Sequence, residues 1–84
     1  MFIAWKGLAL KPVYTVLLVP SAQHAVRAEK VLLDAGLVCK LIPVPRQIAS
    51  DCGVCVRVVQ SETEKARRIL AQAGLEVEGV HRLL

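Results

Sequence analysis

The sequence predicts an α+β fold of the ferredoxin-like type, in which the order βαββαβ forms a four-stranded antiparallel sheet with two helices on one face. The first observation behind this prediction is an internal repeat, because residues 28–37 are similar to residues 66–75 at an offset of 38 positions. The second is that each copy lies within a strand–helix–strand pattern. Right-handed crossovers then place both helices on one face and the first and third strands in the middle of the sheet.

The composition agrees with one small domain of this kind. The chain has 84 residues, of which 55% are hydrophobic but only 4% aromatic, so aliphatic side chains must build the core. A chain of this length buries roughly 60–65% of its unfolded surface, so forming a homo-oligomer would help to stabilise it. We expect a single ferredoxin-like domain at residues 13–84. Residues 1–12 are mostly apolar. We expect them to form an N-terminal extension that packs on the domain or on a partner subunit, and the alternative is a disordered tail.

The first copy of the repeat begins with a predicted strand. Residues 13–19 are β-branched or apolar on both faces, as in a central strand, and Pro20 ends the run. Ser21 is a suitable N-cap for the helix that follows, and Gly36 is a suitable residue to end it. Residues 37–42 form the second predicted strand. The predicted helix has one apolar stripe that is expected to be buried, formed by Ala25, Ala28, Leu32 and Ala35. In the second strand, Cys39 lies on the same side as Leu37 and Leu41, which is expected to face the helices.

The second copy follows the same order. Residues 54–59 alternate as a third strand, and residues 61–64 form a capping box that opens the second helix. Gly74 ends this helix, and residues 75–84 form a fourth strand with the charged character of a sheet edge. The sheet face away from the helices is expected to be open. The side chains expected to point to that face are Lys40, Ile42, Cys55 and Arg57.

Charge and cysteine content restrict the cellular setting. The net charge of +4 says little by itself, because the basic residues are interleaved with acidic ones. Three cysteines, an odd number, in a chain without a convincing export signal predict a reducing, cytoplasmic compartment. The apolar run at residues 13–19 is too short to span a membrane, so we expect no membrane association.

The predicted connection between the second and third strands is unusually long. A tight hairpin needs about two to five residues, whereas residues 43–53 contain two prolines, an arginine and a cysteine. Pro43 and Pro45 lack backbone N–H groups, so we expect this segment to leave regular strand geometry. A long connection with these residue types is a candidate functional loop.

Cys52 is the first candidate in this loop for a chemical role. Its neighbours are polar or turn-forming, which favours exposure, and the thiolate is the reactive form of cysteine. Arg46 is a nearby cation that would favour the thiolate, whereas Asp51 would oppose it if the carboxylate faces the sulfur. Cys55 lies between valines in a strand, where packing is the expected role, and Cys39 is expected in the core.

Three other classes of function fit the sequence less well. The pair Cys52 and Cys55 forms a Cys-x-x-Cys, but thiol-redox domains place this motif before a helix and here a strand follows. The pair is also half of a zinc site, yet neither His24 nor His81 is spaced as the second half, so we expect no metal. RNA-recognition domains stack bases on aromatic residues of their middle strands. Tyr14 is the only aromatic residue in the predicted first and third strands, so we expect no nucleic-acid partner.

A set of short motifs in the chain is similar to those of a known family. The residues that carry the likeness are Val19-Pro20-Ser21, Pro43-Val44-Pro45-Arg46, Ser50-Asp51-Cys52-Gly53 and Arg57. With these motifs the sequence resembles the putative selenium/sulfur carrier protein-like family, a set of small bacterial domains, over roughly residues 14–82. The specific part of the likeness is Pro-x-Pro-Arg followed by Cys-Gly.

The resemblance implies a carrier of sulfur or selenium rather than a free-standing enzyme. Cys52 would be the catalytic residue, accepting the chalcogen from a donor protein as a persulfide or selenosulfide and transferring it to an acceptor protein. Arg46, Gly53 and Arg57 match the family motif and would stabilise the thiolate or another anion. No cofactor is implied.

Two positions depart from the family pattern, and a second function stays open. Asp51 stands where a small polar residue is usual, and Cys55 stands where a small non-thiol residue is usual, which adds a candidate resolving thiol. The alternative function is a non-catalytic ligand-binding or dimerising interaction domain, in which the open sheet face forms the contact. A metal-transfer or thiol-redox domain that uses Cys52 and Cys55 is less favoured.

Overall fold

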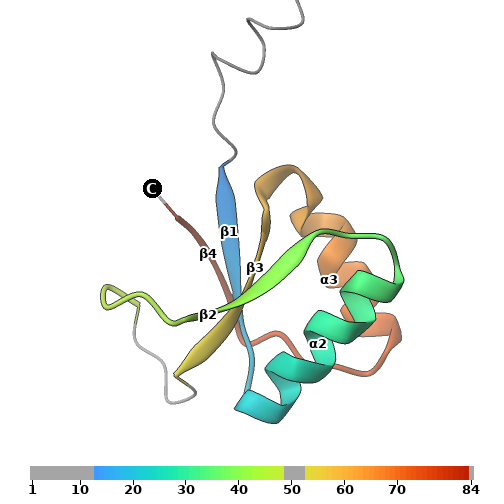
Figure 1. Ribbon diagram of the computed structural model, residues 1–84, viewed down its shortest axis with the longest axis horizontal. Helices are drawn as coiled ribbons and strands as arrows, with labels where there is room; N and C mark the ends of the chain where they lie inside the picture. The colour runs from blue at the N-terminus through green and yellow to red at the C-terminus, as the bar shows by residue number, and fades with distance from the viewer. Residues whose placement is uncertain (1–12, 49–52, 84) are drawn as a thin grey trace, which may run out of the picture.

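The computed structural model describes residues 13–48 and 53–83 of the chain. The predicted extension at residues 1–12 and the loop residues Asp51 and Cys52 lie outside the described residues. In chain order, the elements are β1 (Tyr14–Leu18), α2 (Ala22–Asp34), β2 (Cys39–Pro43), β3 (Val54–Val59), a 3₁₀ turn η1 (Gln60–Glu62), α3 (Thr63–Gln72) and β4 (Gly79–Arg82) (Figure 1).

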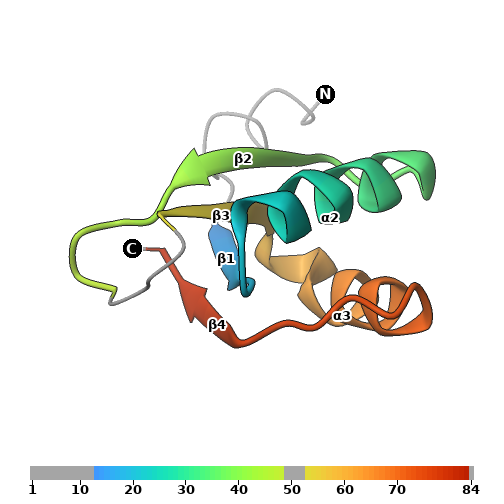
Figure 2. The same cartoon turned by 90° about the horizontal axis from the view of Figure 1, so that it is seen from below.

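The strands form one four-stranded sheet in the order β2-β3-β1-β4, and every neighbouring pair is antiparallel. The predicted central position of the first and third strands is therefore confirmed. Both helices lie on one side of the sheet, while the described part of the β2–β3 connection extends on the other (Figure 2). The α+β class and the two-layer arrangement follow the prediction.

The repeat in the sequence produces the same helix ending twice. Gly36 has a φ of 88° and Gly74 a φ of 75°, in the left-handed region that glycine adopts without strain. After Gly36, the Leu37 N–H donates to the Leu32 carbonyl at 3.0 Å, and the equivalent bond after Gly74 measures 2.9 Å. Each helix therefore ends in a Schellman motif, whose last residue packs into the core.

The two helices begin differently. Ser21 caps α2 as predicted, because its side chain accepts a hydrogen bond from the His24 N–H at 3.2 Å. The predicted capping box at residues 61–64 is wrong, since the N-cap residue of α3 is Glu62 and makes no side-chain cap bond. Ser61 lies inside η1, so it is not in the extended conformation that a capping residue adopts.

The bounds of three strands also differ from the prediction, and β1 is one residue shorter at each end. β2 continues to Pro43, which pairs with Val54. The missing N–H of this proline is tolerated because β2 is an edge strand. β4 begins at Gly79 rather than at residue 75, because Leu75 completes the end of α3 and packs in the core before the chain reaches the sheet.

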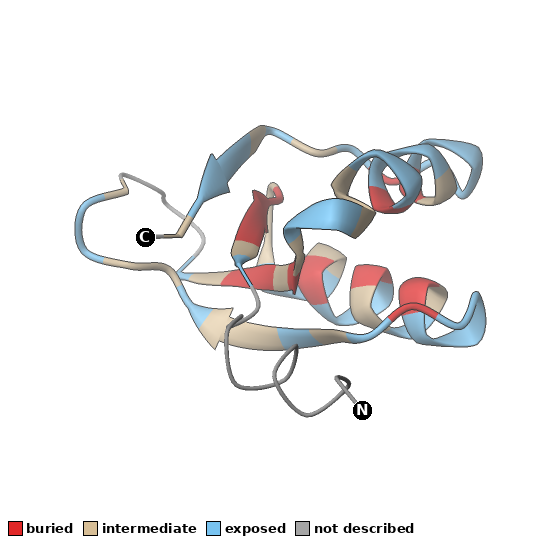
Figure 3. Cartoon of the chain, turned by 90° about the horizontal axis from the view of Figure 1, so that it is seen from above, coloured by how far each residue is buried: buried red, intermediate tan, exposed pale blue. Residues whose placement is uncertain are grey.

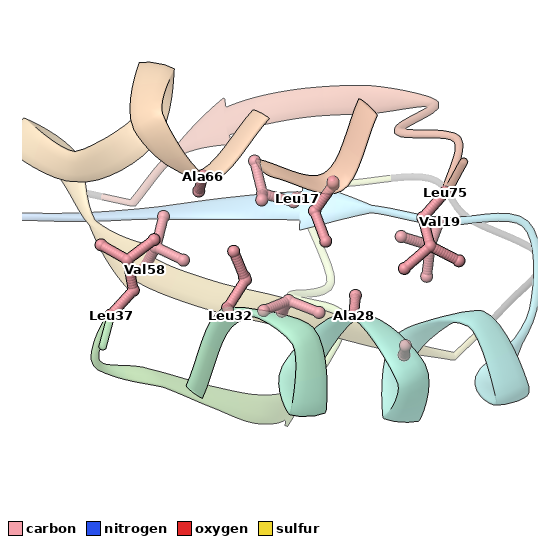
Figure 4. Close-up of a cluster of buried hydrophobic side chains, with 11 residues drawn as sticks. Leu17, Val19, Ala28, Leu32, Leu37, Val58, Ala66 and Leu75 are labelled. Atoms are coloured by element: carbon pink, nitrogen blue, oxygen red, sulfur yellow. The ribbon is translucent and has the colours of Figure 1, made fainter. Parts of the chain in front are cut away.

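The sheet separates two groups of buried side chains. On the helix-side face, Leu17 and Val58 belong to a buried cluster that includes side chains of both helices (Figure 4). The buried positions of the helices are coloured red in Figure 3. Ala35, expected in this group, is exposed because α2 has ended at Asp34. The opposite surface, which we call the loop-side face, holds a smaller cluster. Its buried members are Val16, Leu18 and Cys55, and its half-buried members are Ile42, Val44, Ile48 and Leu83.

Candidate functional site

A backbone hydrogen bond closes the base of the β2–β3 loop. The Val44 N–H donates to the Gly53 carbonyl at 3.0 Å, which continues the strand pairing by one step beyond β2 and β3. The loop between these positions is residues 45–52. Cys52, the predicted catalytic residue, lies outside the described residues and directly precedes Gly53. Cys52 is therefore adjacent in sequence to Gly53, whose carbonyl is hydrogen bonded at the end of the β2–β3 pairing.

The first part of this loop is a reverse turn. The Ile48 N–H donates to the Pro45 carbonyl at 3.0 Å, so residues 45–48 form a four-residue turn with the proline at its first position. Arg46 is the second residue of this turn, and it is exposed. The turn also brings Ile48 back to pack against the loop-side cluster. The sequence therefore builds an anchored loop with an exposed cation.

Gly53 has a backbone role that only glycine fills easily. Its φ is +85°, and a Cβ added there would meet no atom within 4 Å. Backbone conformation, and not lack of space, therefore favours glycine at this position. Because Gly53 follows Cys52 directly, its left-handed conformation sets the direction in which the chain leaves the loop and enters β3.

The loop-side face is more covered than the sequence predicts. The prediction leaves this face open, but Val44, Ile48 and Leu83 pack against its centre. The cause is the reverse turn, which returns an apolar side chain to the sheet, together with the C-terminal end of the described chain (Figure 1). The expectation of a fully open sheet face is corrected to a face whose centre is covered by apolar side chains.

Cys55 lies in this cluster and is 0% exposed. Packing is the role that its position between valines predicts, and burial agrees with it. The same burial restricts any chemistry at its sulfur, because thiol reactivity requires access as well as a thiolate. A resolving role for Cys55 stays a prediction, and it requires a local opening of the strand end.

Cationic side chains lie further along the same face. Arg57 lies directly opposite Lys40 in the pairing of β2 and β3. Its guanidinium stacks over the Tyr14 ring, with 4.1 Å between the guanidinium carbon and the ring centroid. Tyr14 pairs with Val59, which lies beyond Arg57 on the side away from Gly53. The guanidinium of Arg57 therefore extends along the sheet away from the base of the loop.

Cys39 lies on the opposite side of the sheet from Cys55. It packs half-buried against the helix-side core, as predicted, and its thiol donates to the Glu29 carbonyl at 3.6 Å. Burial, together with the nearby Glu29 carboxylate, raises the pKa of the Cys39 thiol above its ordinary value. Cys39 is therefore a poor nucleophile, and the sheet separates it from Cys55.

His24 is a residue whose local partner the sequence prediction missed. Its Nδ1 lies 2.6 Å from the Ser21 Oγ that caps α2. The signal was present as a Ser-x-x-His spacing across the start of a helix. This contact is local to the helix start and does not involve the β2–β3 loop.

The sequence also does not predict that Lys40 and Arg57 lie directly opposite each other, because their pairing depends on the register of β2 and β3. Periodicity predicts that both side chains point to one face, and the structure agrees with this. It does not predict that they face each other directly, since sliding β2 by two residues would keep the faces and change every partner.

Two further findings concern metals and membranes. Within residues 13–48 and 53–83, no group of three or more His, Cys, Asp or Glu side chains is placed to hold a metal ion. No helix in the same part of the chain is long and apolar enough to cross a membrane.

Comparisons with known proteins give one match. The family described as Putative Se/S carrier protein-like matches residues 14–82, which include both helices and all the strands. No curated protein and no solved structure matches the chain significantly.

Proposed function

Because the chain belongs to the Putative Se/S carrier protein-like family, we propose that Cys52 receives sulfur or selenium from one protein and transfers it to another. The observation that supports this proposal is the structure on either side of that thiol. An exposed Arg46 lies in a tight turn, and a left-handed Gly53 is hydrogen bonded to the sheet. A loop anchored on a rigid sheet suits a site that must meet two partners.

The proposed transfer consists of two exchange steps. The Cys52 thiolate attacks the outer sulfur of a persulfide on the donor protein, and the donor thiolate leaves with the electron pair of the broken S–S bond. An acceptor nucleophile then attacks the outer sulfur now on Cys52, and the Cys52 thiolate leaves. Each step forms one bond and breaks one, so no external oxidant or reductant is needed. Selenium would follow the same steps through a selenosulfide.

The proposed stabilising residues contribute unequally. Arg46 shares the loop with Cys52, and its guanidinium would favour the thiolate by direct attraction. Gly53 would allow backbone N–H groups to approach the anionic chalcogen. Arg57 lies four residues beyond Gly53 on β3, about 13 Å away at the usual rise of a strand. Salt screens exposed charges over roughly 10 Å, so we assign Arg57 the smaller electrostatic share.

The proposal also includes a fold class, a cellular location and a set of partners. We assign the sandwich to the ferredoxin-like class, because the element order and the central position of β1 and β3 match what the repeat predicts. We place the protein in the cytoplasm, where a reducing environment keeps free cysteines from forming disulfides. Donor and acceptor proteins are the proposed partners, and a homo-oligomer is a further proposal.

The experiment is an intact-mass measurement on protein purified from its own cells without reductant. We expect a fraction with the mass of one added sulfur or selenium atom, which a thiol reductant removes. Cys52→Ser should lose this fraction completely, whereas the control Cys39→Ser should keep it. An added chalcogen that persists in Cys52→Ser would contradict the assignment of the carrier residue.

The second candidate function is an interaction domain without thiol chemistry. The observation that favours it is the loop-side face, where cationic side chains lie beside a partly exposed apolar cluster. Under this alternative, Cys52→Ser would leave every binding and cellular property unchanged, so the same variant separates the two functions.

A further inference from the structure

Two cations face each other across β2 and β3 on the loop-side face. Lys40 is exposed and Arg57 half-buried, and the strand register places them directly opposite. Side chains in such positions have Cβ atoms about 5 Å apart, and like charges there are destabilising. Among the described residues that the strand pairings place on this face, none is acidic. Among these described residues, therefore, no acidic side chain compensates the two cations, although one would be stabilising there.

The guanidinium of this pair is held in place by Tyr14. Its stacking over the ring, at 4.1 Å from the centroid, limits the positions that the Arg57 side chain can take. His81 lies opposite Val16, and Val16 lies opposite Arg57, so the imidazole belongs to the same row of side chains across the sheet. The two cations Lys40 and Arg57, which we call the positive strip, therefore occupy adjacent positions at one end of this row.

An apolar surface adjoins the strip. The next row toward the loop consists of Ile42, Cys55 and Leu18, and Ile48 from the reverse turn packs on it. Ile42 and Ile48 are half-buried, so they leave apolar area beside the cations. A binding partner for this face must therefore supply anionic groups at one position and apolar groups at the next.

We propose that the loop-side face docks an extended acidic segment of a partner protein. Carboxylates of the segment pair with Lys40 and Arg57, and apolar side chains two positions along, on the same face of the extended segment, cover Ile42 and Ile48. Charge complementarity is the basis for this choice of occupant. A second copy of this chain would bring the same cations to the contact, and nucleic-acid bases would find the ring of Tyr14 already covered by Arg57.

The docked partner is the chalcogen donor or acceptor, a role that rests on the proposed function. Arg57 of the strip lies on β3, which begins directly after Gly53. A segment bound there would hold the partner within one strand length of the loop. The binding itself does not depend on thiol chemistry. It can therefore be tested in the Cys52→Ser variant, and its failure is distinguishable from failure of the carrier function.

The test uses a fluorescein-labelled Leu/Glu peptide with the repeat Glu-Ser-Leu-Ser, in which Glu and Leu share one face of an extended chain, with the same peptide carrying Gln or Lys in place of Glu as controls. Binding is measured by fluorescence anisotropy at low and at physiological salt, and the contact is located by NMR shift changes. We expect binding of the Leu/Glu peptide that weakens with salt, with shift changes on β2 and β3. The Gln and Lys peptides should bind at least about tenfold more weakly.

The decisive variant is Lys40→Glu, with Arg68→Glu on α3 as a control that changes the net charge equally. Arg68 is exposed and belongs to the helix layer. We expect Lys40→Glu to weaken peptide binding at least about tenfold, and Arg68→Glu by less than about twofold. Arg57→Gln should weaken it to a similar degree as Lys40→Glu. Circular dichroism checks that each variant is folded.

Three results would overturn the proposal. Equal effects of Lys40→Glu and Arg68→Glu would show that net charge, and not this face, attracts the peptide. Tighter binding of a labelled single-stranded RNA that also depends on Lys40 would assign the face to nucleic acid. Self-association in sedimentation that Lys40→Glu abolishes would assign it to a second copy of the chain.

Discussion

The two faces of the sheet differ in how their buried side chains are covered. On the helix-side face, side chains from β1 and β3 pack against apolar side chains from both helices, and no charged side chain is buried among the described residues. On the loop-side face, three buried residues are covered by the edges of a loop and of the C-terminal segment, next to a row of cations. Burial by regular helices favours a stable core, whereas partial cover by a loop leaves room for a partner.

Leu17 and Leu18 provide the strongest test of this difference, because they are neighbours on β1 and point to opposite faces. Leu17 is 0% exposed under the helices, and Leu18 is 7% exposed under the loop. We expect Leu17→Ala to lower the free energy of unfolding by about 3–5 kcal/mol and Leu18→Ala by about 2–3 kcal/mol. Urea unfolding followed by circular dichroism measures both. If Leu17→Ala does not fold, Leu17→Val and Leu18→Val replace the pair. Equal losses would show that the loop covers its face as tightly as the helices cover theirs.

The three cysteines test the same comparison by their reactivity. We expect an alkylating agent at neutral pH to label Cys52 at least about tenfold faster than Cys55 or Cys39, since reactivity follows access and thiolate fraction. Cys55 is buried on the loop-side face, and Cys39 has a raised pKa on the helix side. Timed alkylation with peptide mass mapping gives the three rates.

Two variants examine the charged residues that share the β2–β3 loop with the proposed carrier residue Cys52. Arg46→Ala should slow the labelling of Cys52, because it removes a cation that favours the thiolate, and Asp51→Ser should speed it by the opposite effect. Arg67→Ala, on the outer surface of α3, is the matched control and should leave the rate unchanged. Should Cys52 label no faster than Cys39, the loop is a structural turn and the interaction domain becomes the better proposal.

Gly53 allows the loop's backbone to be tested apart from its chemistry. Gly53→Ala should lower the free energy of unfolding by about 1–2 kcal/mol, because alanine is strained at a φ of +85° even though its Cβ would meet no atom. Asparagine tolerates this region, so Gly53→Asn should cost less. Thermal unfolding of the two variants, beside Gly74→Ala as the equivalent change at the end of α3, gives the comparison. A loss that is equal for alanine and asparagine would point to a role other than conformation.

Lys40→Glu is expected to stabilise the folded protein while it weakens the proposed docking. The introduced carboxylate would face Arg57 and replace a repulsion by an attraction, worth about 0.2–1 kcal/mol at this partly exposed position. Chemical unfolding at low and high salt measures the gain, which should shrink as salt rises. Loss of stability in this variant would mean that Lys40 has a structural role on the face that the register does not reveal.

The smallest expected effect is the contribution of Cys39 to the pH dependence of stability. Its folded pKa is raised above the ordinary value of 9.0, so the folded state binds this proton more tightly than the unfolded state does. The contribution is complete below pH 9.0 and is lost as pH rises through the folded pKa. The difference in unfolding free energy between wild type and Cys39→Ala should therefore decrease at alkaline pH. A difference that does not change with pH would contradict the raised pKa.

The sequence by itself determined the elements of this protein and the face on which most side chains lie. Alternation along residues 54–59 correctly separated Cys55 from Val56, and the similarity of residues 28–37 and 66–75 predicted two helices that end alike at Gly36 and Gly74. These features depend on neighbours within a few positions of the chain, so local patterns are enough to predict them. The family motifs around Cys52 were also visible in the sequence, although that residue lies outside the described structure.

Only the tertiary structure decided which side chains from different elements meet. Lys40 faces Arg57 because β2 and β3 pair in one particular register, and the guanidinium reaches Tyr14 because β1 lies beside β3. Ile48 packs against the cluster that contains Cys55 because a reverse turn directs the chain back to the sheet. Register and loop path are set by the packing energy of the whole domain, since a shift of two residues would preserve every local pattern and change every one of these contacts.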